Sequence, residues 1–268
     1  MLYSKTYGLQ KETRNYLRRL YTFNRELASS DIADLDNFIK GLKQLNLWQN
    51  IVCWPMRSIH NLGTGSRVLS LGGLGTFDGT AFNSPSWGIN GIDNITNTTG
   101  YIQVELNLTN RGLIPTGCTL GSLAINHNTV NYAQAIGNET GGSWTRATGL
   151  AYNDTSNIWY YIGTPTGAPA YIGSKNNLYI VTSSGTTNIL FSNGVQVSTD
   201  TRARVDFTNT RITLLAGRSG STEPGGILYY LNARMSLGFV GNTTFSSSAI
   251  SAFYSLYKTT IGKGLGLP

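Results

Sequence analysis

Carboxylates are the first residues to test for catalysis, because retaining hydrolysis of a glycoside needs two carboxyl groups about 5 Å apart. On one strand that geometry calls for acidic residues two positions apart, as in Glu-x-Asp-x-Glu. The chain has these glutamates: Glu12, Glu26, Glu105, Glu139 and Glu223. None has an acidic residue two positions away. Glu105 falls on the polar side of an alternating segment, which favours a solvated strand residue. These residues predict that the chain is not an enzyme.

Histidines, clustered oxygens and glycine-rich loops are the other candidates for chemistry. His60 and His127 are the only histidines, and neither lies in a Gly-x-Ser-x-Gly or His-Glu-x-x-His context. Asp78, Asp93 and Asp154 do not cluster in sequence as calcium ligands would. A Gly-Gly-x-Gly within 63–79 opens no helix of a βαβ unit, so turns explain it better than phosphate binding. We therefore expect no cofactor and no metal.

Aromatic side chains in polar loops are candidates for sugar binding. Saccharides stack their apolar C–H faces on aromatic rings, while Asn, Asp and Arg bind their hydroxyls. Trp87 in NSPSWGING and Trp144 in GGSWTRA lie in Gly/Ser/Asn-rich segments, and Arg146 lies near the second. These three residues are the predicted ligand-binding positions. The alternative is that both rings pack over the edge of the domain. The remaining tryptophans lie in apolar stretches, which favour the core: Trp48, Trp54 and Trp159.

The elements that must position these side chains are mostly short strands. Only 12% of the 268 residues are charged and 32 are Gly, a composition typical of strands joined by polar turns. YIQVELNLT at 101–109 alternates apolar and polar residues, as an antiparallel strand with one buried face does. NILFSNGVQVSTD at 188–200 places Asn193 and Gly194 between two such runs and predicts a two-residue hairpin. Further short runs follow from 122 to 241, with the spacing of a sandwich or barrel.

Helical patterns flank the strands. Residues 31–45 have one apolar face, with Ser29 or Ser30 as the predicted N-cap. Residues 247–257 form a second amphipathic helix, capped by the 246–248 serines. Residues 9–27 show a third, basic pattern, from which we predict a helical arm (1–29) ahead of the main domain (30–268). The predicted partner-docking residues of the arm are Tyr16, Leu17, Arg18, Arg19, Leu20 and Tyr21. Packing of this face back on its own domain stays open as the alternative.

The net charge of +7 is concentrated in the arm, where residues 1–27 hold six Lys or Arg and two Glu. The remaining charge is scattered, without the basic and aromatic stripe that binds a single nucleic-acid strand. We therefore expect no nucleic acid as partner. No apolar run approaches about 18 residues, and the first ten residues lack a signal peptide's apolar core, so membrane insertion is not expected and assembly in a cytoplasm is. Cys53 and Cys118 are too few for a disulfide framework, and buried free thiols are the favoured interpretation.

Three segments in this order resemble the concanavalin A-like, or laminin G-like, jelly-roll domains of tailed-phage virion proteins. They are DNFIKGLKQLNLWQNIVCWPM at 36–56, the Asn-Gly hairpin, and ARMSLGFVGNTTFSSSAISAFYSLYKTTIGKGLG at 233–266. The resemblance covers roughly 30–266 and implies an all-β, antiparallel jelly-roll β-sandwich. It also implies that the helices at 31–45 and 247–257 pack on the sandwich.

The resemblance implies a virion structural protein without enzymatic activity, displayed on the particle surface as a capsid decoration, cement or head-fibre protein. Glycan binding is an expected second task. The expected partners are other capsid or tail proteins, further copies of the chain and a glycan. Three alternatives remain: a receptor-binding module of the tail, a glycan depolymerase on the same fold, and a free-standing lectin. The tail module would be the same kind of virion protein at another location, whereas the depolymerase and the free-standing lectin would have different functions.

Overall fold

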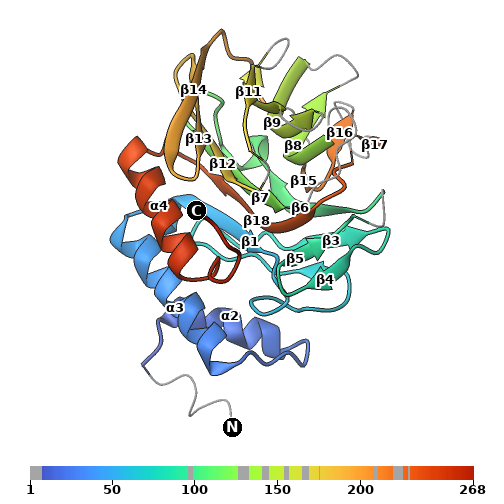
Figure 1. Cartoon of the computed structure of the whole chain (residues 1–268), viewed down its shortest axis with the longest axis vertical. Helices are drawn as coiled ribbons and strands as arrows, with labels where there is room; N and C mark the ends of the chain where they lie inside the picture. The colour runs from blue at the N-terminus through green and yellow to red at the C-terminus, as the bar shows by residue number, and fades with distance from the viewer. Residues whose placement is uncertain are drawn as a thin grey trace.

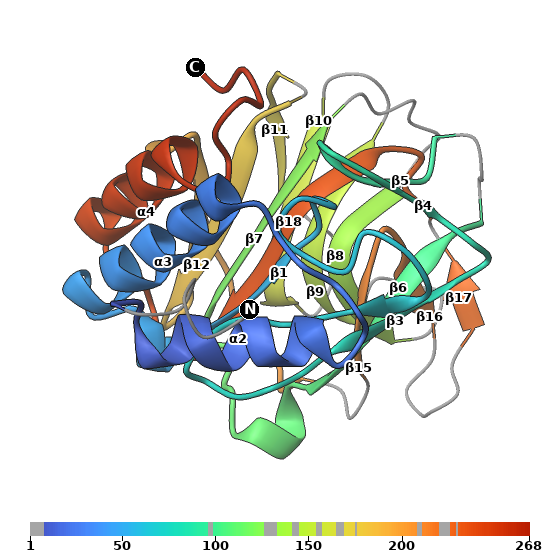
Figure 2. The same ribbon diagram turned by 90° about the horizontal axis from the view of Figure 1, so that it is seen from below.

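The computed structural model describes residues 8–95, 99–125, 133–140, 145–153, 157–164, 169–174, 176–207, 211–219, 226–228 and 230–268. Its strands form two antiparallel sheets, packed as a sandwich, with helices along one side (Figures 1 and 2). This arrangement confirms the predicted all-β jelly-roll sandwich with helices from both ends of the chain packed on it.

Sheet A has the strand order β14-β13-β12-β7-β18-β5-β4, and β1 also pairs with β18. Its strands are β1 (Ile51–Pro55), β4 (Ser86–Gly88), β5 (Gly91–Asp93), β7 (Thr119–Ile125), β12 (Leu178–Ser184), β13 (Thr187–Ser192), β14 (Val195–Thr201) and β18 (Arg234–Gly241). Sheet A is buried on both faces at its centre, since every residue of β1 and β7 is buried.

Sheet B has the order β11-β10-β9-β8-β15-β6-β3-β2. Its strands are β2 (Arg67–Val68), β3 (Gly79–Phe82), β6 (Tyr101–Asn107), β8 (Ala133–Thr140), β9 (Thr145–Asn153), β10 (Asn157–Thr164), β11 (Ala170–Ile172) and β15 (Arg211–Leu214). The short strands β16 (Gly217–Ser219) and β17 (Gly226–Leu228) pair with each other. Two 3-10 turns, η1 (Trp48–Asn50) and η2 (Thr109–Arg111), complete the described elements with the helices below.

Strand β6 shows the predicted alternation. Ile102, Val104 and Leu106 are fully buried between the sheets, whereas the neighbouring polar residues face outward, and Glu105 is exposed as expected. Burying the apolar face of such strands is what drives the two sheets together.

The Asn-Gly pair forms the predicted hairpin turn between β13 and β14. Asn193 has φ 50° and Gly194 φ 81°, the left-handed conformations that a two-residue turn of this kind requires. A Cβ on Gly194 would lie 3.1 Å from the backbone of Ser251. The turn therefore tucks under the C-terminal helix, and glycine suits it for both reasons.

Helices α2 (Lys11–Tyr21), α3 (Ser29–Gln44) and α4 (Ser247–Thr259) lie beside sheet A. Between them and the sheet is a second apolar core, separate from the one between the sheets. Within this core the ring centroid of Phe253 of α4 lies 6.0 Å from that of Phe38 of α3 and 4.8 Å from that of Phe239 of β18. The apolar stripes of the helices read from the sequence are thus buried against the sandwich.

The helix caps differ from one another. Ser246 accepts a hydrogen bond from the backbone N–H of Ala249 at 3.2 Å, as predicted for α4. The predicted cap of α3 was wrong. Ala28 occupies the N-cap position and has no side-chain cap, while Ser29 is already helical. Leu27, just before the cap, is buried, and this apolar anchor sets where the helix begins.

His60 predicts a pH dependence of stability. The side chain is buried, and in the described structure neither ring nitrogen has a hydrogen-bond partner. Burial and, to a smaller extent, the charge of the nearby Arg57 lower the pKa of His60 to about 3. Below about pH 6.5, His60 therefore binds a proton in the unfolded chain but stays neutral in the folded chain until the pH approaches 3.

As the pH is lowered from 6.5 to 3, we expect His60 to reduce the free energy of unfolding by up to about 1.4 kcal/mol per pH unit. Above pH 6.5 His60 is neutral in both the folded and the unfolded chain, so it causes no such loss. Urea unfolding of the wild type and of His60→Leu at several pH values measures this. An equal pH slope in both proteins would contradict it.

Candidate functional site

A cavity of about 610 Å³ opens at one edge of the sandwich. One wall is the loop 63–66, which precedes β2. The other comprises β3, the connection 83–85 and the start of β4. Strands β2 and β4 are the terminal strands of sheets B and A. The cavity therefore lies between the edges of the two sheets. Its volume is in the range of cavities that bind small ligands.

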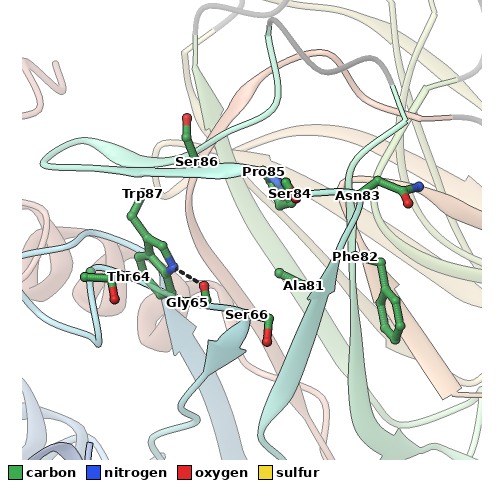
Figure 3. A pocket seen from close by; sticks show the side chains of 11 residues that line it. Thr64, Gly65, Ser66, Ala81, Phe82, Asn83, Ser84, Pro85, Ser86 and Trp87 are labelled. Carbon is green, nitrogen blue, oxygen red and sulfur yellow. Dashed lines mark hydrogen bonds between the residues drawn. The ribbon is translucent and has the colours of Figure 1, made fainter. Parts of the chain in front are cut away.

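Trp87 of β4 forms one side of the cavity (Figure 3). Its indole N–H donates to the carbonyl oxygen of Gly65 at 2.9 Å, joining the end strand of one sheet to the loop that leads into the other. The ring is half-buried and packs against both apolar cores. Trp87 was predicted to lie in a loop, whereas it lies in strand β4, beside the cavity.

Hydroxyl and amide groups surround the rest of the cavity. Ala81 points from β3 toward it, and Phe82 lies on the other side of the strand (Figure 3). The ring of Phe82 stacks on that of Tyr101, with the ring centroids 4.9 Å apart. The polar side chains of the walls are those of Thr64, Ser66, Asn83, Ser84 and Ser86. None of the described lining residues is ionisable.

The connection from β3 to β4 has unusual backbone geometry. Asn83 has φ 56° and Ser84 φ 53°, and two successive left-handed residues without glycine cost free energy of order 1 kcal/mol each. The side-chain amide of Asn83 donates to the carbonyl oxygen of Thr99 at 2.9 Å. This bond helps to hold the hydroxyls of the connection at the rim of the cavity.

Hydrogen bonds from buried and half-buried side chains stabilise the chain on both sides of the loop 63–66 in the opposite wall. The buried amide of Asn61 donates to the carbonyl oxygens of Pro55 at 2.7 Å and Leu69 at 2.9 Å. Arg25, which follows α2, donates to the carbonyl oxygen of Ser58 at 2.6 Å. These bonds fix both ends of the loop that precedes β2.

Asp78 connects α2 to the same region. Its carboxylate forms an ion pair with Arg19 of α2 and lies 3.4 Å from the guanidinium of Arg67, the first residue of β2. It also accepts bonds from the backbone N–H of Ser70 at 2.9 Å and from its hydroxyl at 3.1 Å. The helix and the edge of sheet B are therefore fastened together by one buried carboxylate.

The predicted docking residues of the arm fall into three groups: buried, exposed and ion-paired. Tyr16, Leu17 and Leu20 are buried in the second core, and Tyr16 donates its hydroxyl to the carbonyl oxygen of His60 at 3.0 Å. The alternative left open by the sequence, packing back on the chain itself, describes these three. Arg18 and Tyr21 are exposed, and Arg19 is engaged by Asp78.

Other predicted positions are placed as follows. Trp144 lies outside the described residues, as does His127, and of Arg146 only the backbone, in β9, is described. Trp48 and Trp54 are buried as predicted, whereas Trp159 is half-buried. Cys53 and Cys118 are free and buried, and burial raises the pKa of both thiols.

Several described carboxylates are paired with cations. Glu105 lies 3.7 Å from Arg211, and Asp93 lies 2.5 Å from Arg234. Within the described residues, no group of three or more His, Cys, Asp or Glu side chains gathers as metal ligands would. Also within those ranges, no helix has the length and apolarity needed to cross a bilayer.

No family model matches the sequence, and a search of curated proteins finds no match. Solved structures do match. Trypanosoma rangeli sialidase has a TM-score of 0.56 at 11% identity, covering 86% of this chain and 39% of that chain. The botulinum neurotoxin serotype D binding domain has a TM-score of 0.53 at 11% identity, covering 78% and 52%. A Ruminococcus gnavus IT-sialidase CBM40 reaches 0.43, at 14% identity over 54% and 84%.

The first two matches show a lectin-like β-sandwich fold, as the sequence resemblance implied. At this identity they show the fold alone, and this chain spans about 40% of the sialidase chain that it matches.

The predicted lack of enzymatic activity is contradicted by these comparisons. Structures that share the fold over 86–87% of this chain are sialidases, which are enzymes. The prediction used the spacing of carboxylates along the sequence. Side chains distant in sequence can form an active site once the chain is folded, so that spacing does not exclude catalysis.

Trp87 was among the predicted binding residues, whereas the polar residues that surround it in the cavity were not. The segments GTGS at 63–66 and NSPS at 83–86 each look like ordinary turns. Their shared enrichment in hydroxyls was the available signal. Nothing in the sequence shows that they face each other, because this depends on the folded sandwich: the first segment leads from β1 of sheet A to β2 of sheet B, and the second leads from β3 of sheet B to β4 of sheet A.

Proposed function

We propose that this chain is a glycan-binding β-sandwich displayed on the surface of a phage particle, with the Trp87 cavity as its binding site. The observation that carries the glycan part is the combination in that cavity of an indole ring with the hydroxyls and amide of the surrounding loops. Sugars need both: an aromatic surface for their C–H faces and hydrogen-bonding groups for their hydroxyls.

The rigidity of the cavity supports this proposal. The Trp87 indole is fixed by its bond to Gly65, and the loops are held by Asn61, Asn83 and Arg25. A preformed site loses less conformational entropy on binding than a mobile one. The fold adds support of a weaker kind, since a sialidase solved in complex with sialic acid shares it at a TM-score of 0.54 and 12% identity.

The virion part of the proposal rests on the sequence resemblance and on the outer side of α2. Lys11, Arg18 and Tyr21 of α2 are exposed, as is Phe23 just after the helix, and the two aromatic residues are 52% and 51% exposed. This basic and aromatic side is a suitable contact for an acidic surface of a capsid protein. In this proposal the chain decorates the capsid. A tail location, where the glycan would be the host receptor, is the alternative.

Variants of Trp87 and of the exposed side of α2, measured in two assays, test the proposal. Trp87→Ala is expected to weaken binding on a glycan array about tenfold or more, since a central aromatic contact of this kind is worth about 1–2 kcal/mol. Trp87→Phe, which keeps a ring, should retain more binding. Tyr21→Ala is the matched control, because it removes an exposed aromatic side chain that does not line the described cavity.

In the second assay, which measures binding to particles, the α2 variant is the test and Trp87→Ala is the control. Arg18→Glu combined with Tyr21→Ala is expected to abolish cosedimentation with virus-like particles that lack this protein, while Trp87→Ala cosediments normally. Thermal unfolding establishes that each variant is folded. Absence of glycan binding by the wild type would overturn the glycan part, and absence of cosedimentation would overturn the virion part.

A further inference from the structure

The charges around the Trp87 cavity limit what it can bind. The chain carries a net charge of +7, yet the described side chains that line the cavity are hydroxyls, one amide, apolar groups and the indole. The described residues of its walls offer many hydrogen-bonding groups and no cation.

Three arginines that adjoin the cavity walls already have hydrogen-bonded or ion-paired partners. Arg67, next to Ser66, pairs with Asp78. Arg25, behind the loop 63–66, donates to the carbonyl oxygens of Ser58 and Asn61. Arg234 binds Asp93, the residue opposite Ser86 in the β4–β5 pair, through two nitrogens at 2.5 and 3.1 Å. Turning any of these toward a ligand would break a partly buried contact.

A carboxylate in such a cavity would lose hydration without gaining a cationic partner, which is costly. The hydroxyls of an uncharged sugar would exchange water for Ser, Thr and Asn groups at little net cost. We infer that the cavity takes an uncharged saccharide and discriminates against acidic sugars such as sialic or uronic acids. This inference rests on the proposed glycan-binding function and names its ligand class.

Titration calorimetry on the full chain tests the inference with paired probes. The probes are galactose oligomers against galacturonate oligomers, and lactose against sialyllactose. We expect the uncharged member of a bound pair to bind about tenfold or more tightly than its acidic partner. Its affinity should change less than about twofold between roughly 0.05 and 0.5 M salt, because no ion pair forms.

A substitution supplies the missing charge. Ser66 is an exposed wall residue, so Ser66→Arg is expected to fold normally and to reduce the preference for the uncharged probe at least about threefold. Ser255→Arg, on the exposed side of α4, adds the same charge far from the cavity and should leave the preference unchanged.

The outcomes separate the inference from the function it depends on. Tighter binding of the acidic probe, lost in Trp87→Ala, overturns the inference and leaves glycan binding intact. An equal effect of Ser66→Arg and Ser255→Arg also overturns it, because the local charge would then be irrelevant. If neither kind of probe binds and the glycan array is also blank, the proposed function itself fails.

Discussion

A chain that begins at Ala28 is expected to lose roughly 5 kcal/mol of unfolding free energy, because Tyr16, Leu17 and Leu20 leave the second core and each such side chain contributes about 1.5–3 kcal/mol when buried. The deletion also removes Arg19 from Asp78 and Arg25 from the loop at 58–61. Urea unfolding compares the truncated and full chains.

A point variant keeps this prediction testable if the truncated chain aggregates. Leu20→Ala in the full chain should cost about 2–4 kcal/mol, whereas Arg18→Ala, on the exposed side of the same helix, should change stability by less than about 0.5 kcal/mol. A truncated chain as stable as the full one would show that α2 is a separate arm after all. The burial also explains why truncation is a poor test of virion docking, and why substitutions on the exposed side of α2 are preferred.

The second large effect is expected at Asp78. Asp78→Ala leaves Arg19 without its ion pair and removes the acceptor of the Ser70 N–H. Breaking a buried pair can cost 3–5 kcal/mol, and because Arg19 is partly exposed we expect about 2–3 kcal/mol here.

Asp78→Asn keeps an acceptor for Ser70 and should lose less. Glu105→Ala is the matched control, since the Glu105–Arg211 pair is exposed and 3.7 Å long and should contribute less than about 0.5 kcal/mol. Chemical unfolding of the three variants measures the differences. Equal losses at Asp78 and Glu105 would contradict the role of Asp78 as the fastener between α2 and sheet B.

Local patterns in the sequence predicted the parts of the fold that depend on local physics. The alternation in β6, the left-handed turn at Asn193 and Gly194, and the Ser246 cap each follow from a few neighbouring residues. The apolar stripe of α2 was also visible. Its burial was not, because the surface that covers it comes from α3 and the loop near His60, which are distant in sequence.

The same distinction applies to the site. Trp87 could be selected from its type and polar surroundings alone. The cavity could not be predicted, because it needs the loop 63–66 and the connection 83–85 to face each other across the edge of two different sheets. Enzymatic activity was misjudged for a related reason: spacing along the chain says little about which side chains meet in space.

The central claim is that a glycan binds beside Trp87, and a crystal structure of the chain with the tightest-binding glycan of the array tests it most directly. The account predicts a sugar ring in van der Waals contact with the indole of Trp87, about 3.5–4.5 Å away, with its hydroxyls bonded to the loop 63–66 or to residues 83–86. A glycan bound elsewhere on the sandwich, with the Trp87 cavity empty, would contradict it.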